Sequence, residues 1–291
     1  MINHDIKIHP VSSVDIQQFV KALNLAYADY HVPIQLTRHT FLDLADRESV
    51  DLDASCIAVI DGQIVGMGLL GIRQQHGWIG GMGVIPRFRR HGIGRSIMQT
   101  LLTHAWNRGM HTVQLEVITE NTPACTLYQS LGFCTRQQLL VLNCTRARYQ
   151  LLVDRSAVAV VEESPVELIE HLPEFAFPAP SWQTEIDALK ITLPTLYGLA
   201  ARRRSDHQLV GMCLYQYNGH QGSVAQLCAA DKKYGSMLLT HLFQQHRVTN
   251  FSYLNVPESD PMLPSLKKTG FKVSVRQYEM ILSNPQETRP S

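Results

Sequence analysis

An excess of charge of one sign is missing from this chain of 291 residues. Its 26 lysines and arginines face 25 acidic residues, which leaves a formal net charge of +1. A chain without an overall positive field does not attract nucleic acid or an anionic membrane surface along its length, so any partner must be recognised locally. The basic residues are not interleaved with aromatic ones either, which argues against nucleic-acid binding.

Long apolar runs and clustered cysteines are missing too. No apolar stretch approaches the 18 residues of a membrane span. Residues 1–10 include His4, Asp5 and Lys7, which excludes a signal peptide. The six cysteines lie at least nine positions apart, a spacing typical of neither a disulfide framework nor a zinc site. We therefore expect a cytoplasmic protein with reduced thiols, no bound metal and no membrane contact.

The sequence does contain enough apolar residues, 45% of the chain, for two cores. Segments 61–70 and 206–215 are identical at six of ten positions. Later landmarks keep the same order: Gly94 matches Gly235, and Gly132-Phe133 matches Gly270-Phe271. We interpret this as a duplication with domains at residues 1–148 and 149–291. A coincidence between two strand-turn-strand segments is the alternative.

Hydrophobic periodicity predicts the elements of the first copy. The pattern indicates helices over 16–26 and 37–46, the first capped by Ser12 or Ser13. Asp61-Gly62 indicates a tight hairpin. The remaining elements are strands at 57–60, 64–70, 78–85, 113–118 and 133–142, and helices at 93–109 and 122–132. In the second copy, residues 164–167 form a capping-box pattern. This order predicts an α/β protein of the α+β type, with a mixed sheet flanked by helices in each copy.

A glycine-containing motif lies between the strand at 78–85 and the helix that follows it. It reads Val84-x-Pro86-x-x-Arg89-x-x-Gly92-x-Gly94. Glycines let the main chain approach an anion, while loop amides and the start of a helix supply positive partial charge. The motif therefore predicts a pyrophosphate cradle, with a spacing that differs from the Walker and dinucleotide loops. Taken alone, the loop is equally compatible with a basic surface turn.

A second motif strengthens the interpretation of the first. It reads Asn121-x-x-Ala-x-x-Leu-Tyr128-x-x-x-Gly132-Phe133. Together the two motifs resemble those of the GNAT superfamily of N-acetyltransferases, strongly over residues 57–142 and in pattern over residues 5–50. The resemblance implies acetyl-CoA as co-substrate, with no metal, and a tandem type of GNAT protein whose second copy is degenerate.

The resemblance also implies which residues bind acetyl-CoA. Main-chain amides from Arg90 to Arg95 would hold the pyrophosphate, and the backbone of the preceding strand would lie along the pantetheine arm. The sheet is expected to splay beside that strand, with the thioester in the gap. The expected cofactor-binding residues are Met82, Gly83, Val84, Arg89, Arg90, His91, Gly92, Ile93, Gly94, Arg95 and Asn121.

Two residues match catalytic positions of the family. Direct transfer needs a neutral amine and a proton for the departing thiolate. Tyr128 matches the tyrosine that serves as general acid, and Glu116 matches the base of the ribosomal-protein N-terminal acetyltransferase branch. Packing of Tyr128 on the sheet and a structural hydrogen bond of Glu116 are the alternatives. Many members instead carry an acid on the strand before the glycine loop, and this strand has none, so the base stays open.

Weaker candidates lie near the expected acceptor site. Tyr27, Asp29, Tyr30 and His31 follow the first helix, where the family places its acceptor loop. Core packing of the tyrosines and solvation of Asp29 and His31 are the simpler readings. His76 and Trp78 are similar candidates, and Cys125 is interpreted as a packing residue.

These residues predict an N-acetyltransferase that acts on a small-molecule amine or a peptide amino terminus, as a monomer or homodimer. The alternative is an acetyl-CoA-binding sensor or assembly protein, but a retained Tyr128 favours chemistry. Alignment of the copies puts Leu266 in place of Tyr128 and Leu254 in place of Glu116, after a loop that is short and poor in glycine. We therefore expect a non-catalytic second domain and one acetyl-CoA per chain.

Overall fold

The computed structural model describes residues 6–30, 34–150, 158–175 and 178–285. The chain divides into two compact units, one of residues 1–136 and 279–291 and the other of residues 137–278. The division does not fall at one point of the chain, because its last residues return to the first unit. The expected boundary after residue 148 refers to the copies of the sequence and stays a prediction.

The first unit is built on a mixed sheet, as predicted. Neighbouring strands follow the order β1 (Lys7–Pro10), β2 (Cys56–Ile60), β3 (Gln63–Arg73), β4 (His76–Val84), β5 (Thr112–Ile118) and then β12 (Lys272–Ser283), of which the end belongs to this unit. Pairs from β1 to β4 are antiparallel, and β4 and β5 are parallel.

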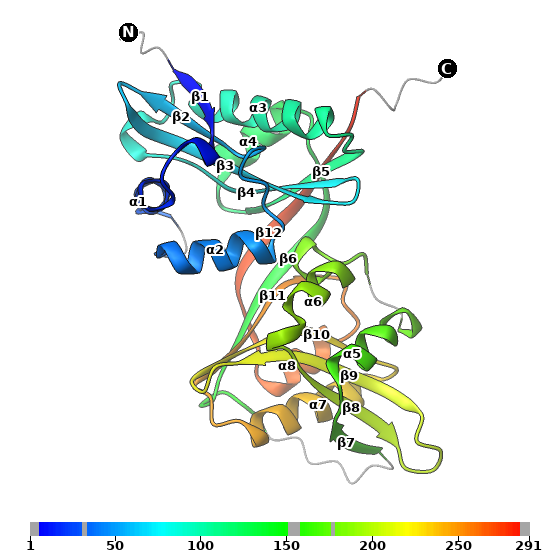
Figure 1. Ribbon diagram of the computed structural model, residues 1–291. Helices are drawn as coiled ribbons and strands as arrows, with labels where there is room; N and C mark the ends of the chain where they lie inside the picture. The colour runs from blue at the N-terminus through cyan, green and yellow to red at the C-terminus, as the bar shows by residue number, and fades with distance from the viewer. Residues whose placement is uncertain (1–5, 31–33, 151–157, 176–177, 286–291) are drawn as a thin grey trace, which may run out of the picture. The chain divides into compact units, whose positions relative to one another are not determined.

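Helices cover both faces of this sheet (Figure 1). The helices are α1 (Ile16–Ala26) and α2 (Arg38–Arg47) on one face, and α3 (Ile93–Asn107) and α4 (Thr122–Ser130) on the other. Met67 and Leu69 belong to the core beneath α1 and α2. Gly68 faces α3, where an added Cβ would come within 2.6 Å of the Leu101 side chain. Side chains alternate along β3, so its large residues pack in the core on one face, while Gly68 lets α3 approach closely on the other face.

The local signals of the first copy were mostly confirmed. Asp61 and Gly62 have φ angles of 48° and 75°, as a tight turn of the predicted hairpin requires. The expected cap of α1 was wrong, because Ser12 and Ser13 belong to a short 3-10 helix, η1 (Val11–Ser13). Asp15 caps α1 instead, and its carboxylate accepts the Gln17 and Gln18 amides at 3.0 and 3.1 Å.

The second unit contains a sheet of the same kind. Its strands lie in the order β12, β6 (Cys134–Thr145), β11 (Asn250–Pro257), β10 (Gln221–Ala229), β9 (Leu209–Tyr217), β8 (Tyr197–Arg203) and β7 (Val158–Glu162). Its helices are α5 (Pro165–Glu170), α6 (Ile186–Thr192), α7 (Lys232–Gln245) and α8 (Leu263–Thr269). Ser164 precedes α5 without a side-chain cap, so the predicted capping box does not form.

The sheet register supports the duplication. Gly66 pairs with Val84 across β3 and β4, and Gly211 pairs with Ala229 across β9 and β10. The repeated segments therefore occupy the same place, on the strand before the central parallel pair. Two strands depart from a simple repeat, because β6 and β12 each contribute residues to both units.

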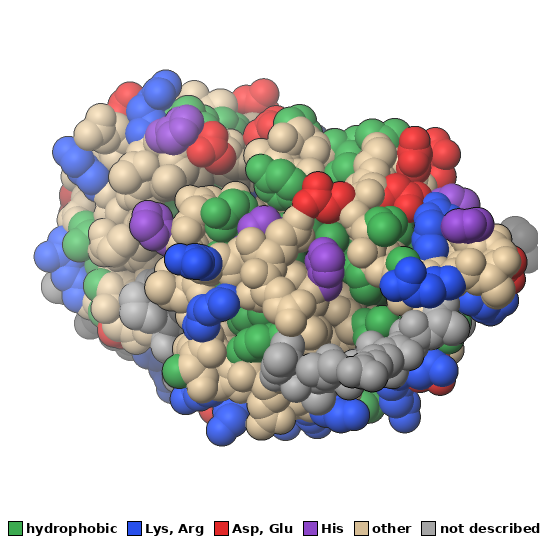
Figure 2. All heavy atoms as spheres, turned by 90° about the horizontal axis from the view of Figure 1, so that it is seen from below, with side chains coloured by type: hydrophobic (Ala, Val, Ile, Leu, Met, Phe, Trp, Pro, Cys, Tyr) green, Lys and Arg blue, Asp and Glu red, His purple; other side chains and the backbone are tan. Residues whose placement is uncertain are grey.

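Neither a membrane-spanning helix among the described residues nor a single type of charge on the face seen in Figure 2 is found. No helix among the described residues is long and apolar enough to cross a membrane. Basic, acidic and histidine side chains are interspersed over the surface in Figure 2, in keeping with the near-zero net charge.

Candidate active site

The strands β4 and β5 separate before they end. Their parallel pairing covers three positions, from His76 opposite Thr112 to Trp78 opposite Gln114. Beyond these positions the two strands share no paired register in the described residues. A bulge marks the separation, because Gly81 and Met82 together face one residue of β3, and Gly81 has a φ of 57°. This is the splay that the family resemblance implied.

The loop between β4 and α3 leaves a run of amides open. Arg90 and Gly92 adopt positive φ angles of 69° and 79°, which turn the chain into the helix. The first α-helical bond here runs from the Ser96 amide to the Gly92 carbonyl. No hydrogen bond between described residues uses the six amides from Arg90 to Arg95. These are the amides expected at the pyrophosphate, and they lie at the positive end of the α3 dipole.

Arg89 contacts the protein rather than the open amides. Its guanidinium binds both Asp29 oxygens at 2.7 Å and also donates to the carbonyls of Ala26 (3.0 Å) and Val84 (2.9 Å). The hydrogen bonds and charge of Arg89 hold the pKa of the Asp29 carboxyl below its usual range. Arg89 thus ties the loop to the end of α1, and its expected role in cofactor binding stays a prediction.

The backbone expected along the pantetheine arm is partly occupied. The Tyr27 hydroxyl donates to the Met82 carbonyl at 3.0 Å, and the Val84 carbonyl accepts from Arg89. A Cβ at Gly83 would lie 3.1 Å from the Tyr27 ring, so glycine allows this close approach. Main-chain groups other than the Met82 and Val84 carbonyls would have to bind acetyl-CoA. The roles of Met82, Gly83 and Val84 remain predictions.

Tyrosines from α4 and from the residues that follow α1 gather near the splay. Tyr128 is 7% exposed, and its hydroxyl has no hydrogen-bond partner among the described residues. Burial, with smaller contributions from Tyr30 and Cys125, raises the pKa of Tyr128 above its usual value. Tyr30 stacks edge-on against Tyr27 with ring centroids 5.0 Å apart. A phenol with a raised pKa stays protonated at neutral pH, so Tyr128 is able to act as a proton donor.

Asn121 connects this group of tyrosines to α4. Its side chain caps the helix by accepting the Ala124 amide at 3.4 Å, and it opposes the rise that burial causes in the pKa of Tyr30. The residue predicted to contact acetyl-CoA thus orders the start of the helix that carries Tyr128.

Glu116 projects from β5 just beyond the paired part of the strand. One carboxyl oxygen accepts the Trp78 indole N–H at 2.6 Å, while the other is buried without a hydrogen-bond partner in the described residues. Burial raises the pKa of Glu116 to about 8, although the Trp78 hydrogen bond opposes the shift. An unpartnered buried oxygen is rare in folded proteins, and together with the shifted pKa it makes Glu116 a candidate functional residue.

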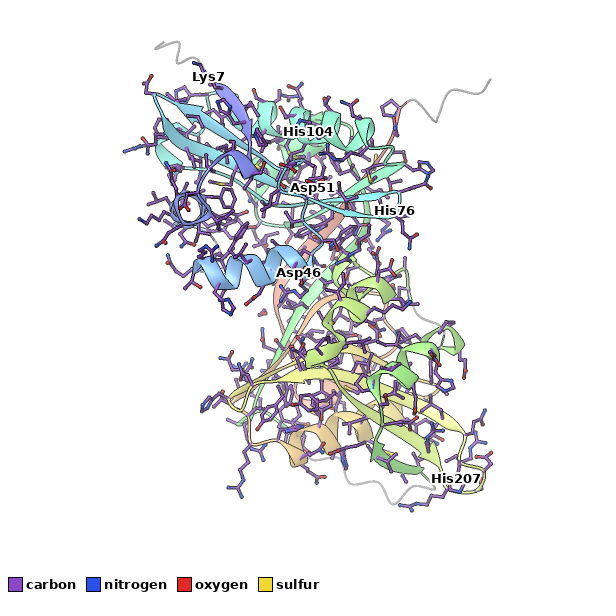
Figure 3. The ribbon with its side chains drawn as sticks, in the orientation of Figure 1. Lys7, Asp46, Asp51, His76, His104 and His207 are labelled. Atoms are coloured by element: carbon purple, nitrogen blue, oxygen red, sulfur yellow. The ribbon has the colours of Figure 1, made fainter. Side chains whose placement is uncertain are left out.

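The other candidates lie elsewhere. His76 lies at the paired start of β4 (Figure 3), where its Nδ1 is 2.8 Å from the Thr112 hydroxyl. His31 falls outside the described residues. The sequence interpretation missed the ion pair of Asp29, and it missed Glu279 of β12, which influences Glu116 electrostatically. No local motif marks Glu279, because it lies far along the chain. No group of three or more potential metal ligands occurs in the described parts of the chain.

Part of the first unit matches a known family. Residues 19–133 match the acetyltransferase (GNAT) family model. The ribosomal protein bS18-alanine N-acetyltransferase of Escherichia coli K12 is 42% identical over 50 residues, which cover 17% of this chain and 34% of that protein. The mycothiol acetyltransferase of Kytococcus sedentarius is 32% identical over 136 residues, 44% of this chain and 45% of that one. The matches thus span less than half the length of these relatives.

Solved structures extend the likeness to the whole chain. A tandem GNAT protein from the clavulanic acid biosynthesis pathway superposes with a TM-score of 0.72 at 14% identity, covering 99% of this chain and 100% of that one. A GCN5-related N-acetyltransferase from Sphaerobacter thermophilus gives 0.74 at 16% identity, covering 96% and 95%. Residues 19–133 therefore match the acetyltransferase (GNAT) family, and the whole chain has the fold of these solved proteins.

Proposed function

We propose that the first unit transfers the acetyl group of acetyl-CoA to a primary amine. The observation that carries the proposal is the run of six open amides from Arg90 to Arg95, placed at the start of α3 and beside the splay of β4 and β5. Such amides suit a pyrophosphate, and the strand gap suits an extended arm that ends at a thioester. The family match over residues 19–133 supports acetyl-CoA as the donor.

In the proposed reaction the amine attacks the acetyl carbonyl carbon directly. The new C–N bond forms as the C–S bond breaks, and the thiolate takes the proton of the Tyr128 hydroxyl. Glu116 receives the proton that the amine loses, directly or through water. A carboxyl whose pKa is about 8 is a better match to an amine than an ordinary glutamate is, because proton transfer is most effective between groups of similar pKa.

The acceptor is proposed to be a small-molecule amine, with a peptide amino terminus as the second candidate. The two relatives reported above represent these two classes, one by a mycothiol acetyltransferase and one by a ribosomal-protein alanine N-acetyltransferase. The tyrosines near the splay, Tyr27 and Tyr30, supply an aromatic wall for either. Fold alone does not select between them.

A thiol-release assay tests the proposal. Purified protein is incubated with acetyl-CoA and a panel of small amines and short peptides, and free CoA thiol is followed with dithionitrobenzoate. Amine-dependent release that mass spectrometry matches to an acetylated amine supports transfer. Saturable acetyl-CoA binding without release on any amine would instead support the sensor alternative. No binding at all would reject both.

A further inference from the structure

Glu279 is a fully buried carboxylate near the proposed site. It lies on β12, the last strand of the chain, which is the sheet neighbour of β5. Its Oε2 accepts from Arg136 Nε at 2.7 Å, and its Oε1 is 3.5 Å from the Gln114 amide nitrogen. Gln114 and Glu116 are two positions apart on β5, so they project from the same face of the sheet. The two carboxyls, Glu116 and Glu279, therefore lie on one face of neighbouring strands.

Groups from several elements surround Glu116. Trp78 of β4 hydrogen bonds to it, while Arg136, at the end of the β6 segment in this unit, acts on it together with Glu279 and Glu48. Glu48, at the end of α2, is held by Arg47 at 2.9 Å and lies 4.0 Å from Arg73 of β3. The nearby arginines are thus matched to the other two carboxylates, and none is bonded to Glu116 in the described contacts.

We propose that Glu279 is a positioning residue of the acetyl-transfer site: a like-charged neighbour, held by Arg136, that makes Glu116 a strong enough base to accept the proton of an amine. The inference rests on the proposed function, because it needs Glu116 to handle that proton. A negative charge beside a carboxyl favours its protonated form. Arg136 is hydrogen bonded to Glu279 at 2.7 Å, so Glu279 and not Glu116 is the carboxyl paired with this arginine.

The alternative role of Glu279 is structural. Its ion pair with Arg136 also ties β12 to β6 within the first unit, and loss of that tie would lower stability without changing how Glu116 titrates. A test must therefore measure the protonation of Glu116 itself. Glu258→Gln is the control. It removes the ion pair of Glu258 with Arg276, a β12 residue that lies in the second unit.

Infrared spectroscopy provides this measurement. The band of the protonated Glu116 carboxyl is assigned by its loss in Glu116→Gln and is then titrated in the full-length protein. We expect a midpoint near pH 8 in the unmodified protein. In Glu279→Gln the midpoint should fall by about one pH unit, since a like charge is removed. Glu279→Asp and Glu258→Gln should titrate like the unmodified protein.

The pH profile of kcat/KM should follow the infrared titration. Its low-pH limb should move to lower pH in Glu279→Gln by the same amount, while the plateau falls because the base is weaker. A Glu116 midpoint that stays unchanged in Glu279→Gln would overturn the inference and leave Glu279 a structural residue. Should Glu279→Gln not fold, Glu279→Asp serves as the test, because aspartate keeps the charge. A Glu116 midpoint that falls by about one pH unit in Glu279→Asp would also overturn the inference. A normal infrared shift without acetylation of any amine would instead reject the proposed function.

Discussion

In the first unit eight residues, 85–92, separate β4 from α3, whereas in the second unit only residues 230 and 231 separate β10 from α7. The longer loop presents open amides at a helix start. The shorter one places Asp231 there, and its carboxylate accepts the Lys233 amide at 2.8 Å. A carboxylate at this position satisfies the helix dipole from within the chain, so no anion is needed. The second sheet thus carries a helix start that its own chain caps, whereas the first carries one with open amides.

The strand gaps differ in the same way. The parallel pairing of β10 and β11 also stops early, after Val224 opposite Tyr253. There the Tyr253 hydroxyl accepts the buried Leu227 amide at 3.2 Å, so a side chain of the unit occupies its own gap. Leu266 is fully buried, and Leu254 on β11 is 49% exposed. Neither leucine is able to exchange a proton. The comparison supports the proposal that one unit is catalytic and the other is not.

The largest expected effect comes from removing the strand that the first unit receives from the end of the chain. Ending the protein after Tyr278 deletes Met280, which is 1% exposed, and Asn284, whose side chain donates to the Met110 carbonyl at 3.1 Å. We expect loss of cooperative folding of the first unit and of acetyl-CoA binding, because an inner strand is lost. Circular dichroism and calorimetry measure both. A protein that ends at Pro285 is the control. If the protein that ends at Tyr278 melts like this control, the strand is not needed for folding.

The cradle should be the next most sensitive feature. Gly92→Leu with Gly94→Leu should weaken acetyl-CoA binding by about 100-fold or more, since two or more hydrogen bonds to a charged group are lost. Gly109→Leu is the matched control, because Gly109 also has a positive φ, 75°, with nothing within 4 Å of an added Cβ. Isothermal titration calorimetry should give one site per chain in the unmodified protein. A stoichiometry of two, or unchanged affinity in the double variant, would contradict the comparison.

Variants of Tyr128 and Tyr253, the buried tyrosines of the two strand gaps, should differ in whether they lower kcat or stability. Tyr128→Phe should lower kcat by roughly 100-fold and leave acetyl-CoA affinity nearly unchanged, as expected for a general acid. Tyr253→Phe should leave kcat unchanged but lower the free energy of unfolding by about 1–3 kcal/mol, because the Leu227 amide loses its partner. Thiol-release kinetics and denaturant unfolding measure the two effects. Equal kcat in both variants would reduce Tyr128 to a packing residue.

The last expected effect concerns how stability depends on pH. Burial raises the pKa of Glu116 to about 8 and that of Asp260, in the second unit, to about 6. The folded protein then binds a proton that the unfolded chain has released, so stability falls as pH rises from the unfolded to the folded pKa, by up to about 1.4 kcal/mol per pH unit for each group. Glu116→Gln should remove the fall between about pH 5 and 8, and Asp260→Asn the one between about 4 and 6. Urea unfolding at half-unit pH steps tests this, and parallel slopes in all three proteins would disprove it.

Local patterns predicted the elements well because each depends on neighbours in the chain. The apolar spacing of α3 predicted Ile97, Leu101 and Ala105 as one face, and all three are fully buried. The caps were predicted less well, since Asp15 caps α1 in place of Ser12 or Ser13, and the Ser164 side chain makes no cap at α5. The second unit was predicted only in outline, because its sequence lacks the motifs of residues 84–94 and 121–133.

The sequence by itself predicted the family match over residues 19–133, the duplication and the open amides of the loop before α3, because these depend on glycines and spacings that act over a few residues. Only the tertiary structure decided what surrounds Glu116 and where Arg89 binds. Arg89 meets Asp29 60 positions away, and Gln114 meets Glu279 165 positions away, on a strand that enters the first unit from the end of the chain. Contacts of that length follow from how the strands are ordered in the sheet, and strand order is decided by the packing of the whole chain.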